Sequence, residues 1–235
     1  MSVSNSAADR AADRYRKLRA QTLGRPLEWD ELRQALEARR VITGYRDMHR
    51  YPLTKVTMGV RSMVHTATRD DTLRPGQRFK RLDRILGKLL RYPHMRLSQM
   101  EDIGGCRVVL PTLLDVQRVQ RRIHRQWPHA KAIDYIAEPK EDGYRGVHII
   151  ERRDGCLIEV QLRTVGQHNW AEAVEEYGPI VGFNLKDGQG PVELRRYFRL
   201  AAERIARAER AEPADERLEA QFVTLREKVR PYFAR

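Results

Sequence analysis

A row of polar side chains marks one face of the segment CLIEVQLRT (156–164). Side chains alternate between the two faces of a β-strand, so Glu159, Gln161 and Arg163 share one face, while the aliphatic residues between them point the opposite way. A carboxylate, an amide and a guanidinium in one row can bind an ion or a phosphorylated ligand. The sequence therefore predicts a strand with one face in the core and one face available for chemistry.

The preceding segment GYRGVHII (143–150) repeats this pattern, with Tyr144, Gly146 and His148 on one face. The residues RRDG (152–155), which separate the two segments, are typical of a hairpin connection. If the two strands pair, their polar faces join into one surface. We expect Gly146 to leave room there for a ligand to approach the sheet.

A second carboxylate precedes another predicted strand. Asp102 lies in EDIGGCRVV (101–109), just before the short apolar strand CRVVL (106–110), and two glycines allow a close backbone approach. Mg²⁺ takes oxygen ligands and usually joins one or two carboxylates to substrate phosphates. We therefore predict that Asp102 and Glu159 form a pair of carboxylates able to hold Mg²⁺.

The segment RFKRLDRILGKLLRYP (78–93) predicts an amphipathic helix with an apolar stripe and a strongly cationic side. Charge runs are commonly solvated helix faces. Here acidic i,i+4 partners are almost missing, so the like charges repel one another unless an anion lies between them. The segment is predicted to bind phosphate. Its apolar stripe comprises Leu82, Ile85, Leu86 and Leu89, and its cations, counted from just upstream, are Arg74, Arg78, Lys80, Arg81, Arg84, Lys88 and Arg91.

The whole chain carries the same excess of positive charge. Its 235 residues have a formal net charge of +13, which favours polyanionic partners such as nucleotides, RNA, DNA or acidic membrane surfaces. The alternative is an Arg-rich soluble protein without such a partner. The sequence contains no Walker A loop, no Rossmann glycine fingerprint and no HExxH motif. Cys106 and Cys156 both lie in strand-like runs and are expected to be inert core residues.

No apolar stretch reaches the length of a membrane span, and the N-terminal MSVSNSAADR lacks the apolar region of a signal peptide. We therefore expect a cytoplasmic protein that does not enter membranes. Helical patterns alternate with short strand patterns, which predicts a mixed α/β (α+β) sheet core flanked by helices. Helices are expected over 7–23, 31–45, 115–127, 167–177, 191–211 and 214–230, with a helical stretch to residue 65 interrupted at Pro52.

Five ordered blocks within about residues 50–180 resemble the RelA/SpoT-type synthetase domain of the alarmone pyrophosphokinases. The blocks are RFKRLDRILGKL, EDIGGCRVV, DYIAEPKEDGYRGVHII, EVQLRT and QHNWAE. The resemblance implies a nucleotidyltransferase-like fold that transfers the β,γ-pyrophosphate of ATP to a 3′-hydroxyl. It also implies a small synthetase with an N-terminal helical extension (1–49), a pyrophosphokinase domain (50–190) and a C-terminal helical extension (191–235).

The resemblance also implies a role for each residue of the site. Asp102 resembles the Mg²⁺ ligand, and Glu159 resembles the second acid, which assists the metal and accepts the 3′-hydroxyl proton. The ATP-binding residues implied in this way are Arg78, Lys80, Lys88 and Arg107, and the acceptor-binding residues are Tyr144, His148, Gln161 and Arg163. Arg78 and Arg107 are expected to enclose the adenine, and Tyr144 to stack on the acceptor base.

The acceptor is the open part of this interpretation. Arg81, Arg84 and the segment 174–176 differ from the pattern of the alarmone makers. Together with the positive charge, they favour the toxic branch of the small synthetases, whose members modify the 3′-CCA end of tRNA, stop translation and are neutralised by an antitoxin protein. The alternatives are GDP or GTP, with (p)ppGpp as product, ATP or ADP as acceptor, and a non-catalytic RNA-binding module.

Overall fold

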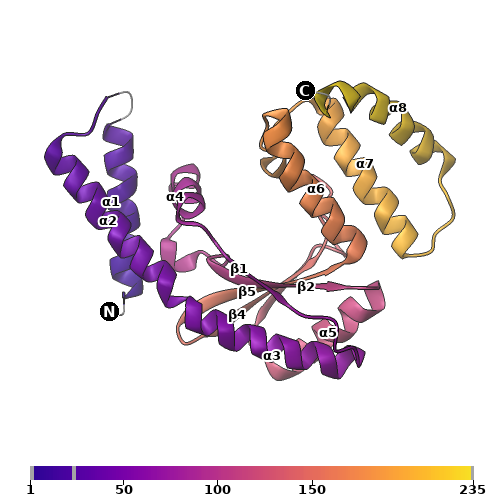
Figure 1. Cartoon of the computed structure of the whole chain (residues 1–235), viewed down its shortest axis with the longest axis horizontal. Helices are drawn as coiled ribbons and strands as arrows, with labels where there is room; N and C mark the ends of the chain where they lie inside the picture. The colour runs from indigo at the N-terminus through magenta and orange to yellow at the C-terminus, as the bar shows by residue number, and fades with distance from the viewer. Residues whose placement is uncertain (1–2, 23–24, 234–235) are drawn as a thin grey trace.

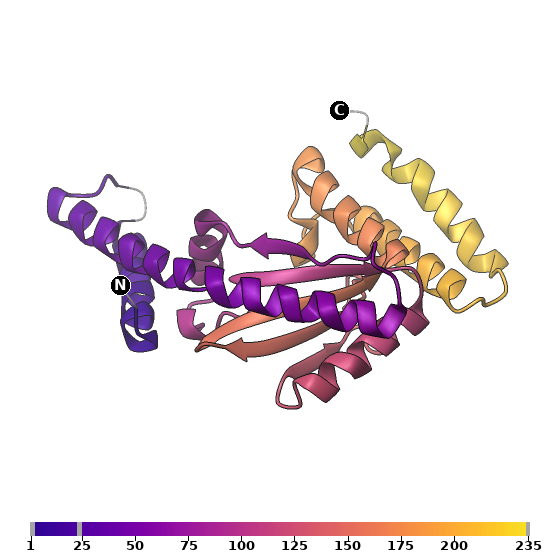
Figure 2. The same ribbon diagram turned by 60° about the horizontal axis from the view of Figure 1, so that its bottom comes forward.

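A five-stranded sheet with helices on both faces forms the centre of the molecule (Figures 1 and 2). This computed structural model describes residues 3–22 and 25–233. Residue 23, the end of the first predicted helix, and the outer ends of the two predicted extensions lie outside the described residues. The arrangement confirms the predicted mixed α/β class.

The sheet has the strand order β1-β2-β5-β4-β3. Only β2 and β5 pair in parallel, and each of the other neighbouring pairs is antiparallel. The two longest polar-faced segments of the sequence therefore lie side by side near its middle. The strands are β1 (Gly76–Phe79), β2 (Gly104–Leu110), β3 (Lys131–Asp134), β4 (Val147–Arg153) and β5 (Cys156–Thr164).

The predicted hairpin joins β4 to β5. Asp154 and Gly155 have φ angles of 50° and 81°, and a two-residue turn with both angles positive suits the right-handed twist of the strands. The turn sets the register in which His148 lies opposite Gln161. This part of the sequence prediction is confirmed.

The apolar face of the sheet packs on α3 (Arg50–Thr68) and α5 (Leu113–Gln126), which lie on the same side of it in Figure 1. Pro52 does not interrupt the helical segment as predicted. It lies in the first turn of α3, where a missing N–H breaks no helical hydrogen bond. The predicted alternation of β5 is confirmed, because its intervening aliphatic residues are fully buried in this core: Ile158, Val160 and Leu162.

The opposite face of the sheet is covered by α6 (Val165–Val181), on which α7 (Val192–Glu209) and α8 (Glu216–Phe233) pack (Figure 1). A short 3₁₀ turn, η2 (Leu185–Asp187), connects α6 to α7. α7 and α8 are the predicted C-terminal helical pair. Among the described helices, none has the combination of length and apolar character that crossing a bilayer requires.

The N-terminal helices α1 (Asn5–Gln21) and α2 (Trp29–Met48) form a hairpin. The buried sides of both helices pack with α4 (Leu82–Arg91) and with the 3₁₀ turn η1 (Leu97–Gln99) in a second hydrophobic cluster. The predicted boundaries at 49/50 and 190/191 fall close to junctions between helices. The division into three functional parts stays a prediction.

The single helix predicted over residues 78–93 is wrong in its first part. Residues 76–79 form β1, in which Arg78 pairs with Gly105 of β2, and the helix begins only at Leu82. Tertiary pairing at the edge of the sheet here overrides a local helical pattern. The apolar stripe is confirmed in the shorter helix, where Ile85 and Leu89 are fully buried.

Candidate active site

The sheet face beneath α6 gathers the predicted polar residues in two adjacent rows. In the first row, Arg78, Gly105 and Glu159 are neighbours across β1, β2 and β5. A Cβ atom on Gly105 would lie 2.8 Å from the carbonyl oxygen of Glu159, so only glycine allows this approach. The second row runs across β2, β5 and β4 through Arg107, Gln161 and His148.

Asp102 lies at the edge of this face, between two lysines. Its Oδ2 atom is 2.7 Å from Nζ of Lys80, and its Oδ1 atom is 3.0 Å from Nζ of Lys88. Burial raises the pKa of the Asp102 carboxyl, but the two ammonium groups outweigh that effect and bring its pKa below the usual range. Asp102 is therefore ionised at neutral pH and joins α4 to the start of β2.

Glu159 is held through both carboxylate oxygens. Oε1 lies 2.8 Å from Nδ1 of His148, and Oε2 accepts a hydrogen bond of 2.6 Å from Gln161. Burial raises the pKa of Glu159, while hydrogen bonds, first that of His148 and then that of Gln161, help to bring it below the usual range. The negative charge of Asp102 also raises the pKa of Glu159. The predicted pairing of the two acids around one Mg²⁺ ion stays a prediction.

The donor set of these two acids fits Mg²⁺. Hard carboxylate oxygens are its preferred protein ligands, and it commonly uses one or two of them together with substrate phosphates. The described residues contain no cluster of three or more His, Cys, Asp or Glu side chains that could bind a metal by themselves. Asp102 and Glu159 would therefore hold the ion jointly with a bound phosphate chain.

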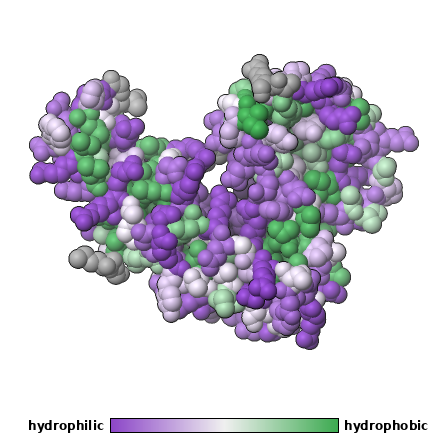
Figure 3. Space-filling model, in the orientation of Figure 1, coloured by the Kyte–Doolittle hydropathy of each residue, from purple (hydrophilic) through white to green (hydrophobic). Residues whose placement is uncertain are grey.

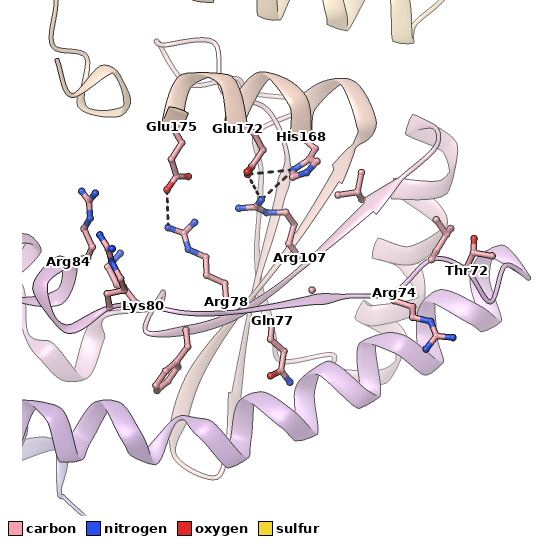
Figure 4. A pocket seen from close by; sticks show the side chains of 15 residues that line it. Thr72, Arg74, Gln77, Arg78, Lys80, Arg84, Arg107, His168, Glu172 and Glu175 are labelled. Atoms are coloured by element: carbon pink, nitrogen blue, oxygen red, sulfur yellow. Dashed lines mark hydrogen bonds and ion pairs between the residues drawn. The ribbon is translucent and has the colours of Figure 1, made fainter. Parts of the chain in front are cut away.

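A cavity of about 730 Å³ opens between β1 and α6 (Figure 4). Lys80 lines this cavity and also donates to Asp102, so it connects the cavity to the pair of acids. In Figure 3 hydrophilic side chains border the hollow between the N-terminal helices and the α6–α8 side of the molecule. The cationic residues that line the cavity are Arg74, Arg78, Lys80, Arg81, Arg84 and Arg107.

Side chains of α6 project into the cavity and pair with its arginines (Figure 4). Oε1 of Glu172 lies 2.5 Å from Nη1 of Arg107, and Oε1 of Glu175 lies 3.8 Å from Nη2 of Arg78. The other oxygen of Glu175 is 2.8 Å from Nζ of Lys186. Two carboxylates thus occupy positions beside the guanidinium groups at which a phosphate or nucleotide would be expected to bind.

The sequence analysis did not assign roles to three of these residues, namely His168, Glu172 and Lys186. His168 and Glu172 are four residues apart in QHNWAE and therefore share one side of α6. Burial, followed by the charge of Arg107, lowers the pKa of His168. The i,i+4 spacing was the available signal for this pair. Lys186 lies in the short 3₁₀ turn η2, which is too short for a periodic pattern to indicate its partner.

Tyr144 and Arg163 lie deeper than an open acceptor site requires. Their exposed fractions are 8% and 4%, and Nε and Nη2 of Arg163 donate to the Tyr144 hydroxyl. Nη1 of Arg163 is buried without a partner among the described residues. The room expected at Gly146 is filled, because a Cβ atom there would lie 3.2 Å from both Arg163 Cγ and the Tyr144 hydroxyl oxygen. That expectation was wrong.

A family model matches the central part of the chain. Residues 77–177 match the family model described as "Region found in RelA / SpoT proteins". This part of the chain, 101 of its 235 residues, is similar to that region. It contains each of the predicted site residues.

Two relatives show how far the sequence similarity extends. An uncharacterised protein of Mycobacterium tuberculosis is 32% identical over 119 residues, which cover 50% of this chain and 44% of the relative. A probable chloroplastic GTP diphosphokinase of Oryza sativa is 32% identical over 114 residues, covering 47% of this chain and 15% of the relative. The chain thus spans less than half the length of these relatives.

Solved structures show that the chain shares the fold of small alarmone synthetases. Small alarmone synthetase 1 of Bacillus subtilis, solved with its product pppGpp, superposes with a TM-score of 0.58 at 22% identity over 69% of this chain and 89% of that one. Small alarmone synthetase 2 of the same organism superposes with a TM-score of 0.59 at 19% identity, over 72% of this chain and 94% of that one. At these identities the likeness concerns the fold.

Proposed function

We propose that this chain is a Mg²⁺-dependent pyrophosphokinase that transfers the β,γ-pyrophosphate of ATP to a 3′-hydroxyl group. The observation that carries the proposal is the position of Lys80, which lines the arginine-rich cavity and donates to Asp102 within 2.7 Å. A site for a triphosphate thereby adjoins a pair of acids. Relatives that share the RelA/SpoT region bear names such as GTP diphosphokinase and GTP pyrophosphokinase.

The reaction asks the protein mainly for positioning and charge neutralisation. The 3′-oxygen of the acceptor forms a bond to the β-phosphorus of ATP, the bond between the β-phosphorus and the α,β-bridging oxygen breaks, and AMP leaves. In this proposal Arg78 and Arg107 bind the adenosine side of ATP. Lys80, which lines the cavity, and Lys88 bind its phosphates in this proposal.

Glu159 is the candidate acceptor of the 3′-hydroxyl proton. It is ionised, because its pKa lies below the usual range, and a carboxylate has about four lone-pair sites, of which His148 and Gln161 use two. The remaining sites are available to the substrate hydroxyl and to Mg²⁺. Bound Mg²⁺ would supply neutralisation of the phosphate charge.

Two acceptors are supported by different observations. GDP or GTP follows from the names of the relatives and from the product pppGpp in a structure of the same fold. For the 3′-CCA end of tRNA we point to the basic rim of the cavity, where Arg74 and Arg84 form no ion pair with any described residue. The tRNA reaction would make the protein a translation-inhibiting toxin with an antitoxin protein as partner.

Incubation with γ-³²P-ATP and one acceptor at a time tests the proposal. The acceptors are GDP, GTP, ATP, ADP and deacylated tRNA, and AMP release is measured in parallel. We expect AMP release together with label transferred to one acceptor class. Binding of RNA with neither AMP release nor label transfer would instead support the non-catalytic RNA-binding module and contradict the proposal.

Glu159→Gln is the matching variant. It keeps the shape of the side chain but removes the proton-accepting charge, so we expect transfer to fall by about 10²–10⁴-fold. Circular dichroism spectra and thermal melting are the controls for folding. A folded Glu159→Gln variant that releases AMP at the wild-type rate would remove Glu159 from this role.

A further inference from the structure

Five side chains of the sheet face form a closed ring of hydrogen bonds next to the cavity. Glu159 contacts His148 at 2.8 Å and Gln161 at 2.6 Å. His148 Nε2 lies 2.5 Å from the Tyr144 hydroxyl. Arg163 closes the ring, with Nη2 at 3.0 Å from both the Tyr144 hydroxyl and Oε1 of Gln161.

The chemistry of the five groups assigns a direction to every hydrogen bond in this ring. A guanidinium only donates and an ionised carboxylate only accepts, so two arms run from Arg163 to Glu159. One arm passes through Gln161, whose carbonyl accepts from Arg163 and whose amide donates to Glu159. The other arm passes through Tyr144 and His148.

The second arm also determines which nitrogen of His148 carries the proton. The Tyr144 hydroxyl accepts from Nε and Nη2 of Arg163, which cannot accept in return. Its own proton therefore points to Nε2 of His148, the other group within hydrogen-bond distance. Nε2 must then be unprotonated, and Nδ1–H donates to Glu159.

We propose that Tyr144 is a positioning residue, whose hydroxyl holds His148 in the tautomer that donates to Glu159. The proposal rests on the proposed function, in which Glu159 accepts the substrate proton. Tyr144 acts through its hydroxyl, which hydrogen-bonds to both Arg163 and His148. The residue is only 8% exposed. Its ring centroid already lies 5.1 Å from Nζ of Lys140 and 4.9 Å from Cζ of Arg163. A stacking role alone would leave the hydroxyl without a function.

Tyr144→Phe separates the two roles, because phenylalanine keeps the aromatic face and loses the hydroxyl. Loss of a partner that orients a reacting group usually costs about 10- to 100-fold in activity. We expect kcat to fall by that factor with little change in the KM of the acceptor. Wild-type kcat in Tyr144→Phe, with a raised acceptor KM in Tyr144→Ala, would show stacking and overturn the proposal.

Tyr135→Phe is the matched control. The Tyr135 ring contacts the same His148 ring edge-on at a centroid distance of 5.1 Å, and its hydroxyl forms no hydrogen bond with the residues that the structure describes. This variant should keep wild-type kcat and KM. An equal loss of kcat in both variants would point to general disturbance of the loop and would overturn the specific role of the Tyr144 hydroxyl.

A second measurement does not depend on activity. In protein labelled with ¹⁵N-histidine, the imidazole signals of His148 report which nitrogen carries the proton, and His148→Gln identifies them by their loss. We expect Nδ1–H with unprotonated Nε2 in the wild type and a shifted Nε2 signal in Tyr144→Phe. The opposite tautomer in the wild type would overturn the proposal. An inactive wild type with the expected tautomer would overturn the proposed function instead.

Discussion

Asp102 contacts lysines from two different parts of the candidate site. Its carboxylate joins Lys80, from the cavity wall, to Lys88, from α4, and its charge acts on Glu159. The side chain is 28% exposed, so water screens these interactions only in part. Removing the charge leaves two ammonium groups facing each other without a counter-ion.

Asp102→Asn should therefore lower the free energy of unfolding at neutral pH by about 1–3 kcal/mol. The folded pKa of Asp102 is lowered, so its stabilisation is present above the unfolded value of about 4 and is lost as the pH falls through the folded value. Urea unfolding at neutral pH and below pH ~4 measures both effects. The variant should lose less stability on acidification than the wild type, and an equal loss in both proteins would contradict this account.

At the scale of elements, α6 forms one wall of the cavity. The helix begins with a capping box at Thr164 and crosses the polar face of the sheet, and its carboxylates pair with the arginines expected to bind ATP. Burial lowers the pKa of the neighbouring Lys186, despite its contact with Glu175. ATP binding would have to displace Glu172 and Glu175 from Arg107 and Arg78.

Glu175→Gln should consequently bind ATP more tightly. Partly exposed ion pairs contribute about 0.2–1 kcal/mol, so the KM for ATP should fall by up to about fivefold. Glu176→Gln is the matched control, because Glu176 is the next residue of α6, is exposed and has no ion pair among the described residues. A higher KM for ATP in Glu175→Gln would show that Glu175 helps to position Arg78 instead of competing with ATP.

At the scale of the whole molecule, the net charge of +13 bears on the choice of acceptor. Binding of a long polyanion releases condensed counterions, with a slope of about 0.7–0.9 per phosphate contact in a plot of log affinity against log salt concentration. A free nucleotide carries no such counterion atmosphere. The salt dependence of the acceptor KM therefore distinguishes tRNA from GDP or GTP.

If tRNA is the acceptor, its KM should rise steeply with salt, and Arg84→Gln should reduce the slope by about one. Arg84 lines the cavity, whereas the control variant Arg217→Gln changes an exposed residue on α8 and should leave the slope unchanged. The KM is measured over a series of salt concentrations. A tRNA KM that does not change with salt would argue against the toxin interpretation and favour a guanine nucleotide.

Local patterns in the sequence determined much of the framework. The period of two in CLIEVQLRT predicted which side chains of β5 enter the core, and RRDG predicted the hairpin that aligns His148 with Gln161. Both depend only on neighbours along the chain or across one short turn. The sequence also placed Asp102 just before one strand and Glu159 within another, and these strands, β2 and β5, are neighbours in the sheet.

Only the tertiary structure decided which partners these residues have. Arg78 lies in a strand and not in a helix because it pairs with β2. Glu172 and Glu175 reach Arg107 and Arg78 because α6 crosses the sheet. Tyr144 is buried because it packs in a cluster with residues of α6 and α7. Such contacts join residues that are distant in sequence, and periodicity describes the environment of a side chain but not its partner.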